Sequence, residues 1–165
     1  MRVIVIGGVS GCGKSTVGRR LAEKLQCPFI EGDDHHSDEN VRKMHAGIPL
    51  TDEDRLPWLQ QLCKAVKSCN SLDVVVSCSM LKRSYRDAIV SMLAECVCIL
   101  IILARPASVV ENALQERQGH FINQEDVHGW LQSQMRDLEI QEDVNLVEAK
   151  GVDETLAEIE QILKK

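Results

Sequence analysis

The chain has 165 residues, 44% of them hydrophobic and 27% charged, with a formal net charge of −6 at pH 7. This length and composition argue against a disordered chain and suit one domain with a sizeable core. The acidic balance argues against a nucleic-acid-binding protein, because phosphate backbones need a basic surface.

Predicted strands and helices alternate along the whole chain. The first strand covers Val3–Ile6, a β-branched apolar run that ends at Gly7-Gly8, and apolar residues at helical spacing follow over Ser15–Leu25. Further strands are predicted over residues 28–31, 73–78, 96–103 and 144–147. Further helices are predicted over residues 39–46, 52–69, 81–93, 108–117, 124–139 and 153–163.

The predicted strands are apolar almost throughout, which is typical of a parallel sheet buried on both faces. We therefore predict one doubly wound α/β domain over residues 1–165, with five parallel strands and helices on both faces. Between two predicted helices, residues 118–125 include Gly119 and mix polar with apolar side chains. This stretch is predicted to form a short mobile lid.

Seven cysteines are scattered along the chain, and none forms a C-x-x-C pair. Their odd number and scattered positions predict a reduced, cytoplasmic protein rather than a disulfide framework. The apolar run at residues 3–9 is too short for a membrane span or an export signal. We therefore expect no membrane association.

The strongest motif is GVSGCGKS at residues 8–15, which fits the phosphate-loop pattern G-x-x-x-x-G-K-[ST] between a predicted strand and helix. Its glycines let successive backbone N–H groups line an anion site at a helix N-terminus. Lys14 can reach the β- and γ-phosphates, and the Ser15 hydroxyl can bind Mg²⁺. The motif predicts a three-layer P-loop NTPase fold in which a nucleotide contacts Gly8, Val9, Ser10, Gly11, Cys12, Gly13, Lys14, Ser15 and Thr16.

Acidic residues after the second predicted strand indicate a kinase rather than a GTPase or motor ATPase. Glu31, Asp33 and Asp34 follow that strand, at the edge of the sheet where α/β proteins bind their ligands. No N-K-x-D tetrapeptide is present, and the strand at 73–77 does not end in an acidic residue. We predict that Asp33 accepts the proton of an acceptor hydroxyl and that Glu31 meets Mg²⁺ through water.

The stretch EGDDHHSDEN at residues 31–40 allows a second interpretation, a structural zinc site. The spacing disfavours it, because the adjacent His35 and His36 point apart in a helix or strand and no H-x₃-H or cysteine partner lies nearby. Two further hypotheses for the function stay open. One is a kinase for another small acceptor, such as shikimate or a nucleoside monophosphate, and the other is a nucleotide-binding regulator without turnover.

Five stretches carry a resemblance to one family: GVSGCGKST, GDDHHSDEN, KMHAGIPLTDEDRLPWL, CSMLKRSYRD and RQGHF. From Val5 to about Glu139, the chain resembles gluconokinases of the small P-loop type, which are related to shikimate kinases and nucleoside monophosphate kinases. The third stretch is the most specific of the five. The chain departs from the family pattern at Glu31, Ser37 and Met80, where the family often has aspartate, proline and alanine.

The resemblance implies ATP-dependent phosphorylation of D-gluconate at its 6-hydroxyl, with Mg²⁺ accompanying ATP, and it suggests a homodimer. Lys14 and Arg117, the lid arginine of the RQGHF stretch, are implied to neutralise charge on the transferred phosphoryl group. The alternative for Arg117 is a cation that only complements the C-terminus of a helix.

Gluconate carries one carboxylate and five hydroxyls, so its site needs a bidentate cation and several polar partners. Arg55 and Arg86 are the predicted cations, and Lys82 shares a helical face with Arg86. A solvated basic face is the alternative for these three residues. The predicted acceptor set is Asp33, His36, Lys43, Arg55, Lys82, Arg86 and His120. No motif marks the residues that hold adenine.

Overall fold

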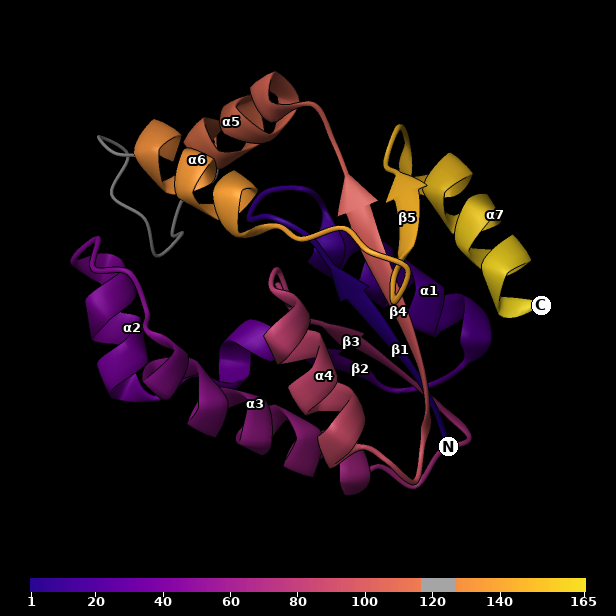
Figure 1. Ribbon diagram of the computed structural model, residues 1–165. Helices are drawn as coiled ribbons and strands as arrows, with labels where there is room; N and C mark the ends of the chain where they lie inside the picture. Colours follow the sequence, from indigo (N-terminus) through magenta and orange to yellow (C-terminus); the bar gives the residue numbers. More distant parts are fainter. Residues whose placement is uncertain (117–126) are drawn as a thin grey trace.

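Five parallel strands form one sheet in the described part of the computed structural model, which comprises residues 1–116 and 127–165. Their order is β2-β3-β1-β4-β5, and helices cover both faces (Figure 1). The strands are β1 (Arg2–Gly7), β2 (Phe29–Glu31), β3 (Asp73–Ser77), β4 (Val97–Ala104) and β5 (Asn145–Glu148). The predicted α/β P-loop fold is confirmed, and each strand lies within one residue of its expected bounds.

The helices of the described ranges follow the predicted order. They are α1 (Lys14–Leu25), α2 (Asp38–His45), α3 (Asp52–Lys67), α4 (Arg83–Met92), α5 (Ala107–Glu116), α6 (Val127–Asp137) and α7 (Val152–Leu163). Helix α3 begins with a capping box: the Thr51 side chain accepts the backbone N–H of Asp54, and the Asp54 side chain accepts that of Thr51. A short 3₁₀ helix, η1 (Gly32–His35), has no counterpart among the predicted elements.

The two faces of the sheet explain why the interiors of its central strands are apolar. Alternate residues of a strand point to opposite faces. Ile4 of β1 packs with Leu21 of α1 and Ile159 of α7 on one face. Val5 packs with Ile89 of α4 on the other face, which α3 also covers (Figure 1). Both faces are therefore buried, as the continuous apolar runs predict.

The carboxyl ends of the parallel strands lie along one edge of the sheet, where α/β proteins bind their ligands. At this edge β1 leads into residues 8–13, β2 leads into η1, and β4 leads toward α5. Helices α5 and α6 pack against each other beyond the same edge (Figure 1). The sheet order thus brings the phosphate loop and the acidic stretch, which are separated by all of α1 in sequence, to the same edge.

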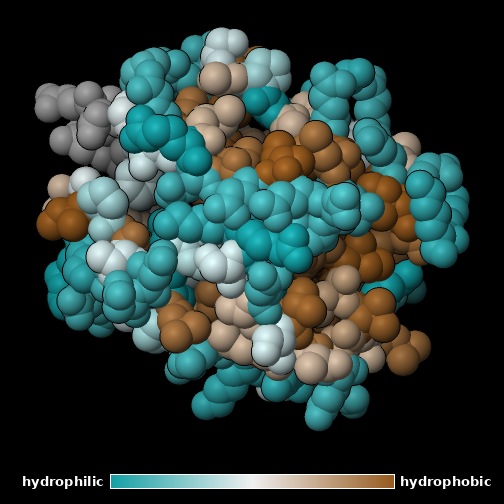
Figure 2. All heavy atoms as spheres, in the orientation of Figure 1, coloured by the Kyte–Doolittle hydropathy of each residue, from teal (hydrophilic) through white to brown (hydrophobic). Residues whose placement is uncertain are grey.

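The surface mixes polar and apolar side chains. On the face drawn in Figure 2, hydrophilic residues predominate and hydrophobic ones form separate patches. Exposed large hydrophobic residues come from separate segments, including Ile48, Leu72, Val97 and Ile140. Within residues 1–116 and 127–165, every helix is too short or too polar to cross a membrane.

Candidate active site

The phosphate loop, residues 8–13, joins β1 to α1. Gly13 is the N-cap residue of α1, with a φ of 104° that glycine adopts without strain and with no side-chain cap. Its carbonyl accepts a hydrogen bond from the Val17 N–H at 2.9 Å. Because no side chain caps the first turn of α1, its N–H groups favour an anion, as the motif predicts.

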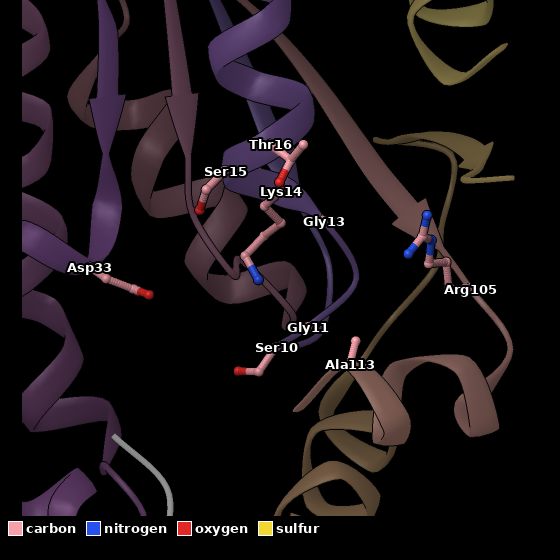
Figure 3. Close-up of a pocket in the computed structure, with 9 residues that line it drawn as sticks. All are labelled: Ser10, Gly11, Gly13, Lys14, Ser15, Thr16, Asp33, Arg105 and Ala113. Atoms are coloured by element: carbon pink, nitrogen blue, oxygen red, sulfur yellow. The ribbon is translucent and has the colours of Figure 1, made fainter. Parts of the chain in front are cut away.

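A cavity of about 290 Å³ opens in front of this loop (Figure 3). The Lys14 side chain lies along the loop, where its Nζ donates to the Val9 carbonyl oxygen at 2.9 Å. Six of the nucleotide residues predicted from the motif and the predicted base therefore share one space. The lining residues are Ser10, Gly11, Gly13, Lys14, Ser15, Thr16, Asp33, Arg105 and Ala113.

Three of the predicted nucleotide contacts belong to the loop but do not line the cavity. The side chains of Val9 and Cys12 are buried in the core. The Gly8 N–H donates to the Ser79 carbonyl, and the Cys12 N–H donates to the Val9 carbonyl, each at 3.3 Å. These buried side chains and backbone hydrogen bonds stabilise the loop. Contact of Gly8, Val9 and Cys12 with a nucleotide stays a prediction.

The 3₁₀ helix η1 places Asp33 at the cavity. Its first residue, Gly32, donates its N–H to Ser77 Oγ at 3.2 Å and accepts the Trp58 indole N–H at 2.7 Å. A Cβ atom at Gly32 would lie 2.1 Å from the Ser77 carbonyl oxygen, so only glycine lets η1 pack this closely against β3. The Asp33 carboxylate points across the cavity toward Lys14 (Figure 3).

Glu31, at the end of β2, is held by protein partners. The Ser77 hydroxyl donates to one carboxylate oxygen, and the Arg19 guanidinium lies 3.5 Å from the other. The residues that line the cavity do not include Glu31, and its contact with Mg²⁺ through water stays a prediction. Across both described ranges, no group of three or more His, Cys, Asp or Glu could hold a metal ion, and the zinc hypothesis has no ligand set there.

A second cavity adjoins the first and shares Ser10, Lys14 and Asp33 with it. We call it the acceptor-side cavity. It brings His36 and Arg55 together with Asp33, which unites three predicted acceptor residues beside the phosphate loop. The rest of its lining comes from Met44, Leu50, Ser79, Trp130 and Gln134.

His36 is held by stacking in this cavity. Its ring lies on that of Trp58, with centroids 4.3 Å apart and 14° between the planes. Burial lowers the pKa of His36 to about 4, with the charges of Arg55 and His35 also lowering it and that of Asp33 opposing them. At pH 7 the imidazole is therefore neutral, which suits it to hydrogen-bond an uncharged hydroxyl.

Lys43 and Lys82 are held in ion pairs, and neither lines the two cavities. Lys43 Nζ lies 2.7 Å from the Asp54 carboxylate, a hydrogen bond that raises the pKa of Lys43. Lys82 Nζ lies 3.5 Å from the Asp52 carboxylate and 5.6 Å from the centre of the Tyr85 ring. Their predicted contact with gluconate stays a prediction.

The predicted role of Arg86 is corrected by its surroundings. Its side chain has no exposed surface, and Nε and Nη2 bind the two oxygens of Asp143 at 2.5 and 3.2 Å. Nη1 donates to the carbonyls of Met80 and Leu81 at 3.2 and 2.9 Å. The hydrogen bond from Arg86 lowers the pKa of Asp143. Arg86 is thus a buried structural cation, which leaves Arg55 as the arginine of the acceptor-side cavity.

Several polar residues of the two cavities were not predicted: Ser79, Arg105, Trp130 and Gln134. Arg105 follows β4, and its Nε donates to the carbonyl of Ala149, just after β5, at 2.9 Å. Ser79 belongs to the CSMLKRSYRD stretch, which gave it no role, and no motif marks Arg105, Trp130 or Gln134. Tertiary packing brings all four to the site. The predicted lid, residues 118–125, lies outside the described residues together with Arg117 and His120.

Comparisons with known proteins agree on one family. Residues 3–138 match a family model described as an AAA domain. The chain is 40% identical over 127 residues to a probable gluconokinase of Dictyostelium discoideum, a match that spans 73% of this chain and 64% of that relative. It is 38% identical over 154 residues to a probable gluconokinase of Mus musculus, covering 83% of this chain and 82% of that one.

A solved structure extends the likeness to the whole fold. A gluconokinase from Sinorhizobium meliloti 1021 matches with a TM-score of 0.80 and 39% identity, over 99% of this chain and 95% of that one. The chain belongs to the gluconokinase family. Membership of this family confirms the resemblance drawn from the five sequence stretches. Family membership assigns no role to any single residue of this chain.

The half-buried His36 predicts that the stability of this gluconokinase-family fold falls at acid pH. Because its pKa is about 4 in the folded chain and near 6.5 when unfolded, the unfolded state binds more protons between these values. The free energy of unfolding should therefore fall from pH 6.5 toward pH 4, by up to about 1.4 kcal/mol per pH unit from this group. In His36→Gln that part of the loss should vanish, as measured by urea unfolding at pH 7 and pH 4.5. His35→Gln is the matched control, and equal pH dependence in both variants would contradict the assignment.

Proposed function

We propose that this chain transfers the γ-phosphoryl group of ATP to the 6-hydroxyl of D-gluconate, giving 6-phospho-D-gluconate and ADP. The observation that carries the proposal is the position of Asp33, which lines both the phosphate-loop cavity and the acceptor-side cavity. A carboxylate between the two substrates can take a proton from one while the other loses its phosphoryl group. The gluconokinase names of the relatives support gluconate as the acceptor.

The nucleotide phosphates are bound by the loop and the start of α1. Backbone N–H groups and the helix N-terminus favour the negative charge, and Lys14 neutralises it where it grows during transfer. Lys14 would exchange its present bond to the Val9 carbonyl for the phosphates. Arg105 lines the far side of the same cavity and would face the nucleotide from there (Figure 3).

Mg²⁺ fits the oxygen donors of this cavity. The Ser15 hydroxyl and the Asp33 carboxylate both line it, and hard oxygen ligands suit this ion. The Ser15 hydroxyl would hold Mg²⁺ together with the phosphates of ATP, and Glu31 would meet it only through water. The ion, when bound, supplies further neutralisation of phosphate charge.

The transfer step needs one proton acceptor. As the 6-hydroxyl oxygen bonds to the γ-phosphorus, the bond from that phosphorus to the β–γ bridging oxygen breaks, and Asp33 takes the hydroxyl proton. Arg55 would bind the gluconate carboxylate, and neutral His36 a hydroxyl. We propose that Arg117 and His120 complete the site from the lid, as the resemblance implies.

Two wider proposals accompany this function. All seven cysteines are free, which supports a reducing compartment, and we propose the cytoplasm. The homodimer suggested by the resemblance also stays a proposal, and light scattering after size-exclusion chromatography measures it directly.

An acceptor panel tests the proposed function. Initial rates of ADP release are measured at saturating Mg-ATP with D-gluconate, shikimate or AMP. We expect D-gluconate alone to stimulate ADP release well above the rate without acceptor. Stimulation by shikimate or AMP but not by gluconate would favour another small-molecule kinase, and no stimulation by any acceptor would favour a regulator without turnover.

A further inference from the structure

Helix α6 contributes two residues to the acceptor-side cavity, Trp130 and Gln134. They are four residues apart and therefore lie on the same face of the helix. The Trp130 ring also packs against the core cluster that contains Leu114 and Leu131, so its position is set by the fold. This face of α6 forms a wall of the cavity whose other residues come in part from η1 and α3.

Gln134 fixes α6 onto the phosphate loop. Its Oε1 accepts the Ser10 N–H at 2.6 Å, and its Nε2 donates to Ser10 Oγ at 3.1 Å. Both ends of the amide are used, so the orientation of the amide is determined by one loop residue. Gln134 is thus a positioning residue that couples the place of α6, and with it Trp130, to the loop that binds phosphate.

The indole N–H of Trp130 stands out among the buried polar groups. Among the buried side-chain nitrogens and oxygens of residues 1–116 and 127–165, the Trp130 nitrogen is the one without a hydrogen bond. The Trp58 indole, in contrast, donates to the Gly32 carbonyl at 2.7 Å. Buried donors without partners are uncommon and costly, and one beside a binding cavity calls for an explanation.

We propose that the Trp130 indole N–H donates a hydrogen bond to an oxygen of the acceptor and so helps to select polyhydroxylated acids. An indole nitrogen can only donate, so it pairs with a hydroxyl or carboxylate oxygen and never with another donor. Polar side chains of Asp33, His36, Arg55 and Ser79 line the same cavity, together with the apolar Met44 and Leu50. This inference rests on the proposed function, because it assigns one contact to the gluconate molecule that the proposed reaction phosphorylates. A site built to bond an oxygen discriminates against acceptors that lack it.

Steady-state kinetics of Trp130→Phe give the first test. Loss of one hydrogen bond should raise the KM for D-gluconate roughly 3- to 10-fold while the KM for ATP stays unchanged. The melting temperature should be unchanged or higher, because phenylalanine keeps most of the ring and removes the unpaired donor. The matched control is Gln132→Ala on the exposed side of α6, which should leave both KM values as they are. An unchanged gluconate KM in Trp130→Phe overturns the proposal.

A direct measurement on the wild-type chain covers the case in which the variant does not fold. The chain has two tryptophans, so a ¹⁵N-tryptophan-labelled sample gives two indole N–H signals. Their assignment comes from a Trp58→Phe or Trp130→Phe sample, whichever folds. We expect D-gluconate to move the Trp130 signal downfield, as a new hydrogen bond does, in the presence of ADP and Mg²⁺. If gluconate is turned over but this signal does not move, the Trp130 contact is wrong and the proposed function stands; if gluconate is not turned over, both fail.

Discussion

Asp33→Asn is expected to lower kcat for D-gluconate by roughly 100- to 10,000-fold, the usual contribution of a general base. Asparagine has nearly the same shape and keeps the backbone of η1, including the bond from the His36 N–H to the carbonyl of residue 33. It cannot accept the hydroxyl proton. ATP binding should stay close to wild type, because the loop and Lys14 carry most of the phosphate contact. Rapid-quench or coupled assays give kcat, and equilibrium titration with a fluorescent ATP analogue gives the affinity.

Asp34→Asn is the matched control for this experiment. Asp34 is the next residue of η1, it is also exposed, and it does not line either cavity. Its replacement should change kcat by less than a factor of about 3, in line with surface substitutions elsewhere. If Asp33→Asn turns over gluconate at the rate of Asp34→Asn, Asp33 is not the base and the mechanism must use another group.

Arg86→Met is expected to lower the free energy of unfolding by about 3 kcal/mol, the lower end of the cost of removing one partner from a buried ion pair, because Asp143 is 16% exposed and keeps some solvent. The loss leaves Asp143 without its bidentate cation and the carbonyls of Met80 and Leu81 without their donor. Met80 has a φ of 30°, a conformation rarely adopted outside glycine, so its loop needs this support. Urea unfolding followed by circular dichroism measures the change.

Arg83→Met provides the comparison for Arg86. Arg83 lies one turn earlier on α4, is 46% exposed, and pairs with Asp87 at 3.1 Å. Its Nη1 also lies 2.9 Å from Gln141 Oε1 and 3.8 Å from Asp143 Oδ1. Exposed pairs of this kind contribute little to stability, so this variant should lose much less stability than Arg86→Met. A finding that Arg86→Met is as stable as Arg83→Met, yet has lost gluconate binding alone, would restore the acceptor role first predicted for Arg86.

Arg55 and Arg86, the two predicted acceptor arginines, show which features of the site local sequence patterns can predict and which they cannot. Local patterns predicted all five strands, most clearly β1, β3 and β4, whose interiors are continuous apolar runs. They also predicted the phosphate loop from its glycine and lysine spacing. The same patterns placed Arg55 and Arg86 on helices at the ligand-binding edge. They could not show that Asp143, 57 residues later, would neutralise one of them.

The missed parts of the site depend on distant contacts in the same way. The 3₁₀ helix η1 is held in place because Gly32 packs on Ser77, 45 residues away, whereas its own polar residues are typical of an ordinary acidic loop. Gln134 reaches the site through Ser10, 124 residues earlier in the chain. Contacts between residues so far apart in sequence produce no periodic pattern or motif, because the sequence around one partner does not indicate where the other partner lies.

The most direct test of the central claim is the identity of the product. The purified protein is incubated with Mg-ATP and uniformly ¹³C-labelled D-gluconate, and the product is examined by ³¹P and ¹³C NMR. We predict one new phosphomonoester, formed in equal amount to ADP, whose phosphorus couples to carbon 6 of gluconate. A phosphorus signal from inorganic phosphate alone, or a phosphoester on any other carbon, would contradict the assignment of this chain as a gluconate 6-kinase.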